Sequence, residues 1–402
     1  MPASASSPIR AAADQLVDVG LSDLVGVVPR LREALVQVVD PRARRGVRHP
    51  LVVVLSAAVC AVAAGAQSYV AIAEWVADLP EQVAAALGLN EKCPCESTIR
   101  RVVQRLDGDR FDTVISAWIA QQLHATRPPV GPRRAVAVAV DGKTLRGTRN
   151  DDSPPRHLLA VIDHQARVVL GQINVTGAKE RAEGKAGEIA AFAPLLERLD
   201  LNDVVVTADA LHTQRGHVDY LHQRGAHWVL TVKGNQPRLR RQLAGLPWRA
   251  LQVDERRAET RHGRREIRSI KVVTIAAGIA FPHAAQAIQL RRRSRPASGR
   301  GRWHTETVYA VTDLRPHQAR PAELADWIRG HWQIENALHW VRDVAYAEDH
   351  SRVRTGHGPQ VMASLRNLVI SILRLAGVTN IAAALRRHSR NPTRPLATFG
   401  IT

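Results

Sequence analysis

The pattern of hydrophobic and polar positions changes character at about residue 130. Between residues 31 and 125 apolar side chains recur at helix spacing, as they do over residues 68–79. A stretch rich in proline and glycine lies at residues 127–134 and is typical of a linker. We therefore predict a loosely attached segment over residues 1–30 and an α-helical domain over residues 31–130.

Beyond the linker the pattern alternates with a period of two. Alanine and valine alternate over residues 135–147, so Val138 and Val140 face one side of a predicted strand and Asp141 faces the other. Asp209 lies at the C-terminal end of a second apolar strand pattern. Further strand or helix patterns cover residues 156–175, 185–200, 216–223 and 227–236. This order predicts an α/β layer structure, in which ligands bind beyond the carboxyl ends of strands.

Residues 238–312 interrupt this alternation. They are rich in arginine and contain three short strand patterns, which predict a β-rich insertion. The chain returns to a helical pattern at about residue 321. We therefore predict that residues 131–402 form one catalytic domain that contains the insertion.

A lone glutamate, Glu335, lies inside this later helical pattern. At 100° per residue, an apolar stripe is formed by Trp327, Ile334, Leu338, Val341 and Ala345, and a neighbouring stripe by His331, Glu335, His339 and Arg342. Glu335 is thus predicted at the border of the buried face. A carboxylate in such a place is costly unless it is paired or binds a metal ion.

The charge of the chain points to a polyanionic partner. The formal net charge is +19 and the sequence pI is about 11.1. Because basic side chains that neutralise phosphates release counterions, nucleic acid is the partner that this charge favours. A basic soluble protein without such a ligand is the alternative.

Cysteine content and hydropathy limit the class of protein further. Three cysteines give no disulfide framework, which fits a reducing cytoplasm. The N-terminal residues lack the apolar core of a signal peptide. The longest apolar run, residues 51–66, is shorter than the ~20 residues of a membrane-spanning helix and predicts a buried core helix.

Asp141, Asp209 and Glu335 are the candidate catalytic and metal-binding residues. Their carboxylates form an all-oxygen ligand set, which suits Mg²⁺ or Mn²⁺. Two such ions can stabilise the attacking and leaving oxygens of a phosphoryl displacement. Spacing alone is a weak signal, because 37 acidic residues allow many such triples.

The motifs around these residues are more specific. The sequence contains VAVDGKTLRG, TADALHTQ, VLTVKGNQPRL and IRGHWQIENALHW, together with GAQSYVAIAEW, ESTIRRVVQRLD and EDHSRVRTGHGPQVMASLRNL. With these blocks the chain resembles the DDE insertion-sequence transposases of the H-repeat-associated (ISAs-type) family from about residue 40 to 375. The resemblance implies an RNase H-like catalytic core, with the family's two aspartates at Asp141 and Asp209 and its glutamate at Glu335.

Two motifs depart from those of related transposases. Their glutamate sits in a Tyr-x2-Arg-x3-Glu-x6-Lys signature, whereas this chain has Ile328, His331 and Arg342 at the flanking positions. Because the tyrosine is absent, we do not extend a hairpin intermediate to this chain. Relatives also commonly carry Asn before the glutamate of the GKAGEI segment, where this chain has glycine.

Other polar residues near these motifs are candidate DNA contacts. They are Lys143, His212, Gln214, Lys233, Asn235, Gln236, His331, His339, Arg342, Arg100, Arg101 and Arg105. The last three lie on one predicted helix, which either reads the DNA sequence or is an ordinary amphipathic helix. The two histidines either orient Glu335, contact a phosphate, bind zinc with Glu335 or have a structural role. Trp332 and Trp340 are predicted to pack in the core rather than to stack on bases.

The sequence thus predicts a DNA transposase of an insertion sequence. We expect Mg²⁺-dependent (or Mn²⁺-dependent) phosphodiester hydrolysis at transposon ends, with two ions, and then strand transfer into target DNA. The expected partners are double-stranded terminal inverted repeats and target DNA, bound by a homodimer in the bacterial cytoplasm at the nucleoid, without a membrane. The alternatives are a catalytically inactive or domesticated DNA-binding protein and an RNase H-like host nuclease.

Overall fold

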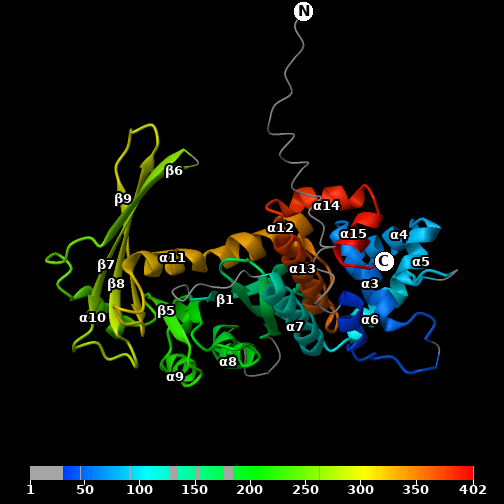
Figure 1. Ribbon diagram of the computed structural model, residues 1–402, viewed down its shortest axis with the longest axis horizontal. Coiled ribbons are helices and arrows are strands. Elements are labelled where there is room, and N and C mark those ends of the chain that lie inside the picture. The colour runs from blue at the N-terminus through cyan, green and yellow to red at the C-terminus, as the bar shows by residue number, and fades with distance from the viewer. Residues whose placement is uncertain are drawn as a thin grey trace, which may run out of the picture. The chain divides into compact units, whose positions relative to one another are not determined.

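The computed structural model describes residues 30–45, 47–89, 92–126, 135–150, 154–175, 184–261 and 263–401. The predicted N-terminal segment and the predicted linker lie outside these residues, except at Arg30. The chain divides into two compact units, residues 130–341 and residues 1–129 with 342–402 (Figure 1).

The second of these, the helical unit, consists of α-helices. They are α2 (Leu31–Val36), α3 (Leu51–Ala63), α4 (Tyr69–Ala77), α5 (Glu81–Leu87), α6 (Glu96–Arg105), α7 (Gly108–Thr126), α13 (Gly358–Leu375), α14 (Ile381–Ser389) and α15 (Thr393–Thr398). The apolar run at residues 51–66 forms α3, which is almost entirely buried, as predicted. Among the described residues, no helix is long and apolar enough to cross a membrane.

Residues 342–402 belong to a different unit from the one that the sequence predicted. We expected residues 342–402 to belong to the catalytic domain, but they form one compact unit with the N-terminal helices. The reason is α13, which is buried over nearly its whole length and packs against α7 and α3. Buried Asp112 of α7 accepts hydrogen bonds from Gln360 and Ser364 of α13, which fixes this long-range contact.

The other unit is built on one nine-stranded mixed sheet (Figure 1). Its strands are β1 (Ala137–Leu145), β2 (Arg156–Asp163), β3 (Val169–Asn174), β4 (Val205–Ala208), β5 (His227–Val232), β6 (Glu255–Arg261), β7 (Arg264–Thr274), β8 (Gln286–Pro296) and β9 (His304–Thr312). They lie in the order β3-β2-β1-β4-β5-β9-β8-β7-β6. Among these described strands, only the pairs β1–β4 and β4–β5 are parallel.

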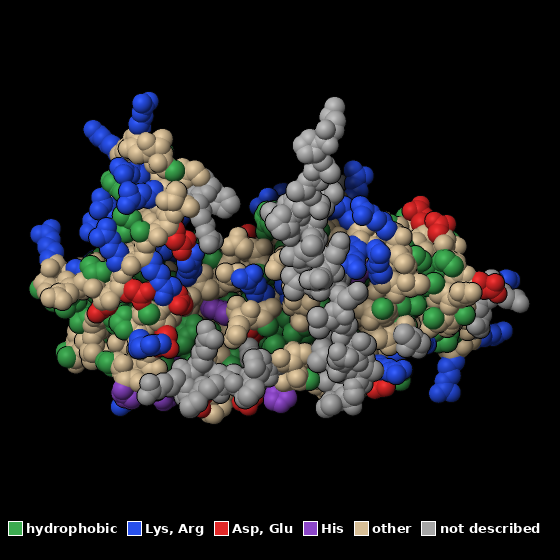
Figure 2. Space-filling model, turned by 45° about the horizontal axis from the view of Figure 1, so that its top comes forward, with side chains coloured by type: hydrophobic (Ala, Val, Ile, Leu, Met, Phe, Trp, Pro, Cys, Tyr) green, Lys and Arg blue, Asp and Glu red, His purple; other side chains and the backbone are tan. Residues whose placement is uncertain are grey.

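The β-rich insertion is not a separate subdomain. Strand β9 pairs antiparallel with β5, so β6 to β9 extend the same sheet. The sequence pattern predicted β7, β8 and β9 but missed β6, whose polar and charged residues show no apolar alternation. Lys and Arg side chains gather over this extension (Figure 2).

The two faces of the sheet are covered by different helices. Val138 and Val140 of β1 belong to a core with residues of α8 (Gly184–Leu196), α9 (Arg215–Gln223) and α10 (Pro237–Ala244). Ala137 belongs to the opposite core, which is covered by α11 (Pro321–His331). The alternation predicted from the sequence is therefore confirmed, and it turns Asp141 towards the face that carries α11.

Candidate active site

Asp141 and Asp209 lie at the same level of two neighbouring parallel strands. The register pairs Val140 of β1 with Ala208 of β4, and each aspartate is the next residue along its strand direction. Asp209 begins a short 3₁₀ turn, η3 (Ala210–His212), and its Oδ1 accepts a hydrogen bond from the backbone N–H of Leu211 at 2.8 Å.

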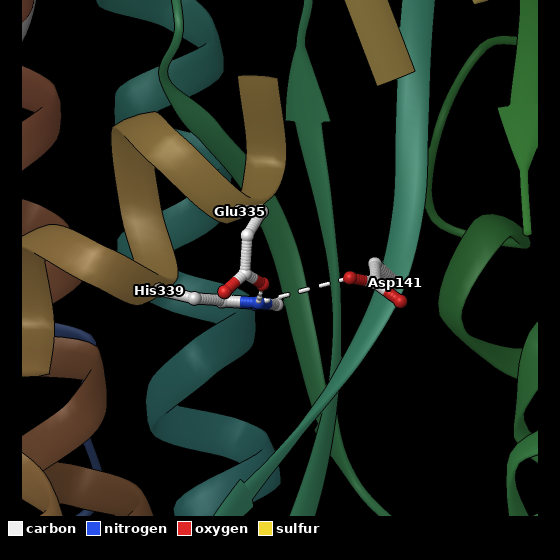
Figure 3. A group of neighbouring side chains, drawn as sticks. All are labelled: Asp141, Glu335 and His339. Carbon is white, nitrogen blue, oxygen red and sulfur yellow. Dashed lines mark hydrogen bonds and ion pairs between the residues drawn. The ribbon is translucent and has the colours of Figure 1, made fainter. Parts of the chain in front are cut away.

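Glu335 reaches Asp141 from the other side of the site (Figure 3). It is the first residue of η4 (Glu335–His339), a π-helical turn that lies between α11 and α12 (Trp340–Tyr346). His339 Nδ1 lies 3.2 Å from Glu335 Oε2 and 3.7 Å from Asp141 Oδ2. One potential ligand atom from each of these three residues lies within 4.8 Å of the others. The site therefore joins the middle of β1 to a helical segment that is distant in the sequence.

The electrostatics of Asp141 are those of a crowded acidic site. Burial, and then the charge of Asp209, raises the pKa of Asp141 to about 7, and Glu188 and Glu335 act in the same direction. The hydrogen bond from His339 lowers the pKa of Glu335, whose side chain is half exposed. A proton is therefore favoured at Asp141, whereas Glu335 is stabilised as a carboxylate.

The helix around Glu335 differs from the continuous α-helix that the sequence predicted. The π-helical turn accommodates an extra residue and rotates the faces of the residues on its C-terminal side. Ile334, Leu338 and Val341 are buried as predicted. Trp332 and Trp340 are 64% and 58% exposed, so the prediction that they pack in the core is wrong. Their indole rings lie on the outer surface of the segment that carries Glu335.

Sequence reasoning missed a fourth carboxylate close to Asp141. Glu188 of α8 lies 2.8 Å from His157 Nε2 and 3.6 Å from His212 Nε2. Burial opposes ionisation of Glu188, but the two histidines together lower its pKa to about 2. The sequence signal is the GKAGEI segment, whose glutamate has no role in the sequence-based prediction.

Gly142 explains why this carboxylate can approach the site so closely. A Cβ atom at Gly142 would lie 2.5 Å from His157 Nε2 and 2.6 Å from Glu188 Oε2. A side chain there would displace both groups. The glycine of the Asp-Gly-Lys motif therefore makes room for the Glu188–His157 pair directly beside Asp141.

Several predicted DNA contacts instead support the turn after Asp209. Asn235 donates a hydrogen bond to Ala210 O and Gln236 donates one to Thr213 O. Gln214 donates to Leu211 O, and His212 is fully buried beside Glu188. These four side chains hold the η3 turn and its surroundings in place.

The remaining predicted contacts occupy three kinds of environment. Lys143 is largely buried on the face of β1 that carries Asp141, and its charge helps to lower the pKa of Glu335. Lys233 is exposed after β5. Burial lowers the pKa of His331 to about 4, and His331 is not part of the three-residue ligand group that the described residues form. Because His331 lies outside this group, the structure does not support zinc binding by His331, Glu335 and His339 together.

The predicted arginine contacts belong to the helical unit. Arg342 is fully buried and pairs with Glu348 at 2.7 Å, so its position does not fit the predicted DNA contact. Arg100, Arg101 and Arg105 lie on α6, where Arg100 pairs with Glu96. Arg101 and Arg105 are exposed.

The carboxylates of the site fit a divalent cation with a preference for oxygen. Asp141, Asp209 and Glu335 would supply oxygen ligands, and a cation among them would remove the repulsion that raises the pKa of Asp141. Asp209 lies outside the three-residue group within 4.8 Å. His339 adds one nitrogen to that group, next to Asp141 and Glu335.

Comparisons with known proteins identify the family to which the chain is similar. A family model described as "Transposase DDE domain" matches residues 132–372, and one described as "DDE_Tnp_1-associated" matches residues 32–119. A relative from Escherichia coli O157:H7, named "Putative transposase YncI", is 27% identical over 88% of this chain and 87% of its own length. The "H repeat-associated putative transposase YhhI" of Escherichia coli K12 is 26% identical over 90% of this chain and 94% of its own length.

One solved structure is also similar in part. It is a piggyBac transposase synaptic complex with hairpin DNA, which matches 89% of this chain and 74% of that chain at 10% identity. Its TM-score of 0.41 is too low to support an argument about fold or DNA handling. The first family model, in contrast, spans more than half of the chain and includes all three carboxylates of the site. The chain therefore belongs to the family of transposases that carry a DDE domain.

Proposed function

We propose that this chain is the transposase of an insertion sequence that hydrolyses phosphodiesters at the transposon ends and then joins the freed ends to target DNA. The observation that carries the proposal is the convergence of Asp141 and Glu335, with Asp141 and Asp209 at the same level, just past the point where the parallel pairing of β1 with β4 ends. Membership of the DDE transposase family supports the same chemistry.

The proposed reaction depends on Mg²⁺ or Mn²⁺, with Asp141, Asp209 and Glu335 as ligands. Two such ions, when bound, would neutralise charge on the attacking and leaving oxygens of the phosphodiester. His339 donates a hydrogen bond to Glu335 and so orients its carboxylate towards Asp141. Lys143, on the same face of β1 as Asp141, is proposed to balance the negative charge of the DNA phosphate.

We further propose that β1 to β5 form an RNase H-like core. The support is the order β3-β2-β1-β4-β5, with antiparallel pairing among the first three strands and parallel pairing from β1 to β5. The proposed DNA partner is supported by the net charge of +19 and by the arginines of β6 to β8. A homodimer that pairs two transposon ends belongs to the same proposal.

A cleavage assay tests the proposed function. The full chain is incubated with Mg²⁺ and a duplex that carries the inverted repeats flanking its gene, and nicked and joined products are separated on a gel. We expect Asp141→Asn, Asp209→Asn and Glu335→Gln each to lose cleavage by about a thousandfold or more, because charge stabilisation at the phosphate is lost.

Binding to the same duplex separates a catalytic defect from a folding defect. Each variant is expected to bind the duplex as tightly as the wild type in EDTA. Glu197→Gln, which removes an exposed carboxylate at the end of α8, is the matched control and should cleave normally. Full cleavage by any of the three site variants would refute the assignment.

A further inference from the structure

A groove of about 700 Å³ lies within the helical unit. Three segments line it: residues 65–71 at the start of α4, part of α6, and residues 346–355 before α13. They belong to three of the sequence blocks shared with H-repeat-associated transposases, and the proposed chemistry gives none of them a role. The volume is that of a site for a small molecule or a nucleotide.

The charged residues of this groove are mostly basic. Arg100, Arg352 and Arg354 line it, and its one carboxylate, Glu96, already pairs with Arg100 at 2.9 Å. Arg352 and Arg354 are exposed. The groove therefore carries a positive potential that favours an anion.

Two buried tyrosines in the groove wall have unsatisfied hydroxyl groups. Tyr69 is 6% exposed and Tyr346 is fully buried, and neither hydroxyl has a hydrogen-bond partner among the described residues. A buried polar group left without a partner costs about 1–3 kcal/mol, so a ligand that accepts a hydrogen bond from the groove wall would be favoured. Burial raises the pKa of both, which keeps them protonated as donors.

The position of the Tyr69 hydroxyl adds to this interpretation. It lies against the Cα of Gly358, where a Cβ atom would collide with it. Gly358 begins α13, and although the residues of its first turn are buried, this end of the helix is the positive end of its dipole. Tyr69 itself begins α4, which is capped by Ser68. The N-terminal ends of α4 and α13 thus add to the positive potential around the hydroxyl of Tyr69.

The wall of the groove is held rigidly from behind. Buried Arg366 donates to Glu348 at 2.7 Å and to Gln67 O at 3.2 Å, and its guanidinium lies 5.9 Å from the ring centroid of Tyr346. This arginine ties the segment before α4 to the segment before α13. The two segments that form this part of the wall are therefore joined before any ligand arrives, which lowers the entropic cost of ordering them on binding.

We propose that this groove binds a backbone phosphate of DNA, with the hydroxyl of Tyr69 and the guanidinium of Arg352 as donors. The ligand class is inferred from the positive lining, the unpaired donors and the nucleotide-sized volume. The inference rests on the proposed function only in assigning the phosphate to DNA, and it gives the helical unit a binding role of its own.

The test measures DNA binding of the full chain without metal. Fluorescence anisotropy of a labelled duplex is measured at several salt concentrations in EDTA, for the wild type, Tyr69→Phe and Arg352→Ala. We expect each variant to bind about tenfold more weakly, because one hydrogen bond to a charged group is lost. For Arg352→Ala the slope of log affinity against log salt should fall by about one.

Two controls separate binding from structure. Arg386→Ala removes an exposed arginine of α14 outside the groove and is expected to change the affinity less than twofold. Tyr69→Phe removes an unpaired hydroxyl, so its melting temperature should equal or exceed that of the wild type. Weakened binding in a variant that is at least as stable identifies the hydroxyl as a ligand contact.

Inorganic phosphate distinguishes the two sources of the anion. If it raises the melting temperature of the wild type but not of Tyr69→Phe, while duplex affinity is the same for both, the DNA assignment is overturned. Unchanged duplex affinity in both groove variants also overturns it. The binding measurement does not require cleavage. If the wild type cleaves no DNA but the groove variants still bind the duplex more weakly, the proposed function is contradicted and the proposed phosphate site is not.

Discussion

Two carboxylates of this chain occupy opposite electrostatic environments. Glu348 is 2% exposed, and its two oxygens lie 2.7 Å from Arg342 and 2.7 Å from Arg366. The charges of these arginines overcome the effect of burial and lower the pKa of Glu348 to about 2. Asp141 is 27% exposed and is surrounded by other acidic groups, which with burial raise its pKa to about 7.

The difference separates a carboxylate whose charge is balanced within the chain from one that a bound ion would stabilise. Glu348 has its full set of cationic partners within the chain, so it needs nothing from outside. Burial and the neighbouring carboxylates destabilise ionised Asp141, so a bound ion would lower the free energy of the folded state. A buried carboxylate whose neighbours raise its pKa is therefore a better candidate for a metal site than a buried carboxylate that is paired with arginines.

The largest effect is expected from Glu348→Gln. Loss of this charge leaves Arg342 and Arg366 buried without a counter-ion, which should lower the free energy of unfolding by about 3–5 kcal/mol. Urea denaturation measures it. Glu96→Gln, in a partly exposed pair of the same unit, should cost less than about 1 kcal/mol. If Glu348→Gln and Glu96→Gln lowered the free energy of unfolding equally, Glu348 would not be a strongly stabilised carboxylate, and its contrast with Asp141 would be lost.

Asp141→Asn is expected to act in the opposite direction. Without divalent metal at pH 8 it should raise the free energy of unfolding by about 1–3 kcal/mol, because an ionised carboxylate is removed from an acidic environment. Thermal melts in EDTA measure this. Added Mg²⁺ should stabilise the wild type but not the variant.

The pH dependence of Asp141 has a definite sign. Since its folded pKa is raised, the folded state binds the proton more tightly than the unfolded state. The stability that this contributes is full below the unfolded pKa of about 4 and is lost as the pH rises to about 7. The wild type should therefore lose stability relative to Asp141→Asn over this range, and a gain in its relative stability would contradict the acidic environment of Asp141.

The smallest effect on stability is expected from Trp332→Ala. Its exposed indole should contribute less than about 0.5 kcal/mol to folding. Trp228→Ala, which empties a fully buried position of β5, should cost about 3–5 kcal/mol. If Trp332→Ala instead lost several kcal/mol of unfolding free energy, Trp332 would pack in the core as the sequence predicted.

The strand part of the fold was predictable because its signal is local. The alanine–valine alternation of β1 placed Asp141 on the correct face, and the apolar strand before Asp209 gave the parallel neighbour. The grouping of α13 with α3 and α7 was not predictable, since it depends on contacts between distant segments. The same holds for Glu188, whose role depends on His157 and His212.

The π-helical turn marks the limit of periodicity arguments. A spacing of 100° per residue assumes an unbroken α-helix, whereas the turn at Glu335–His339 shifts the faces on its C-terminal side. That shift helps to explain why Trp340 is exposed. Trp332 precedes the turn, and its exposure reflects its place on the outer side of α11's end.

The central claim, that Asp141, Asp209 and Glu335 hold a divalent cation together, can be tested by iron-mediated cleavage. Fe²⁺ replaces Mg²⁺ at the full chain, and with ascorbate and peroxide it generates radicals that cut the backbone near the ion. Mass spectrometry of the fragments should show cuts next to all three residues, suppressed by excess Mg²⁺ and absent in Asp141→Asn. Cuts confined to other parts of the chain, or cuts unaffected by Asp141→Asn, would contradict the claim.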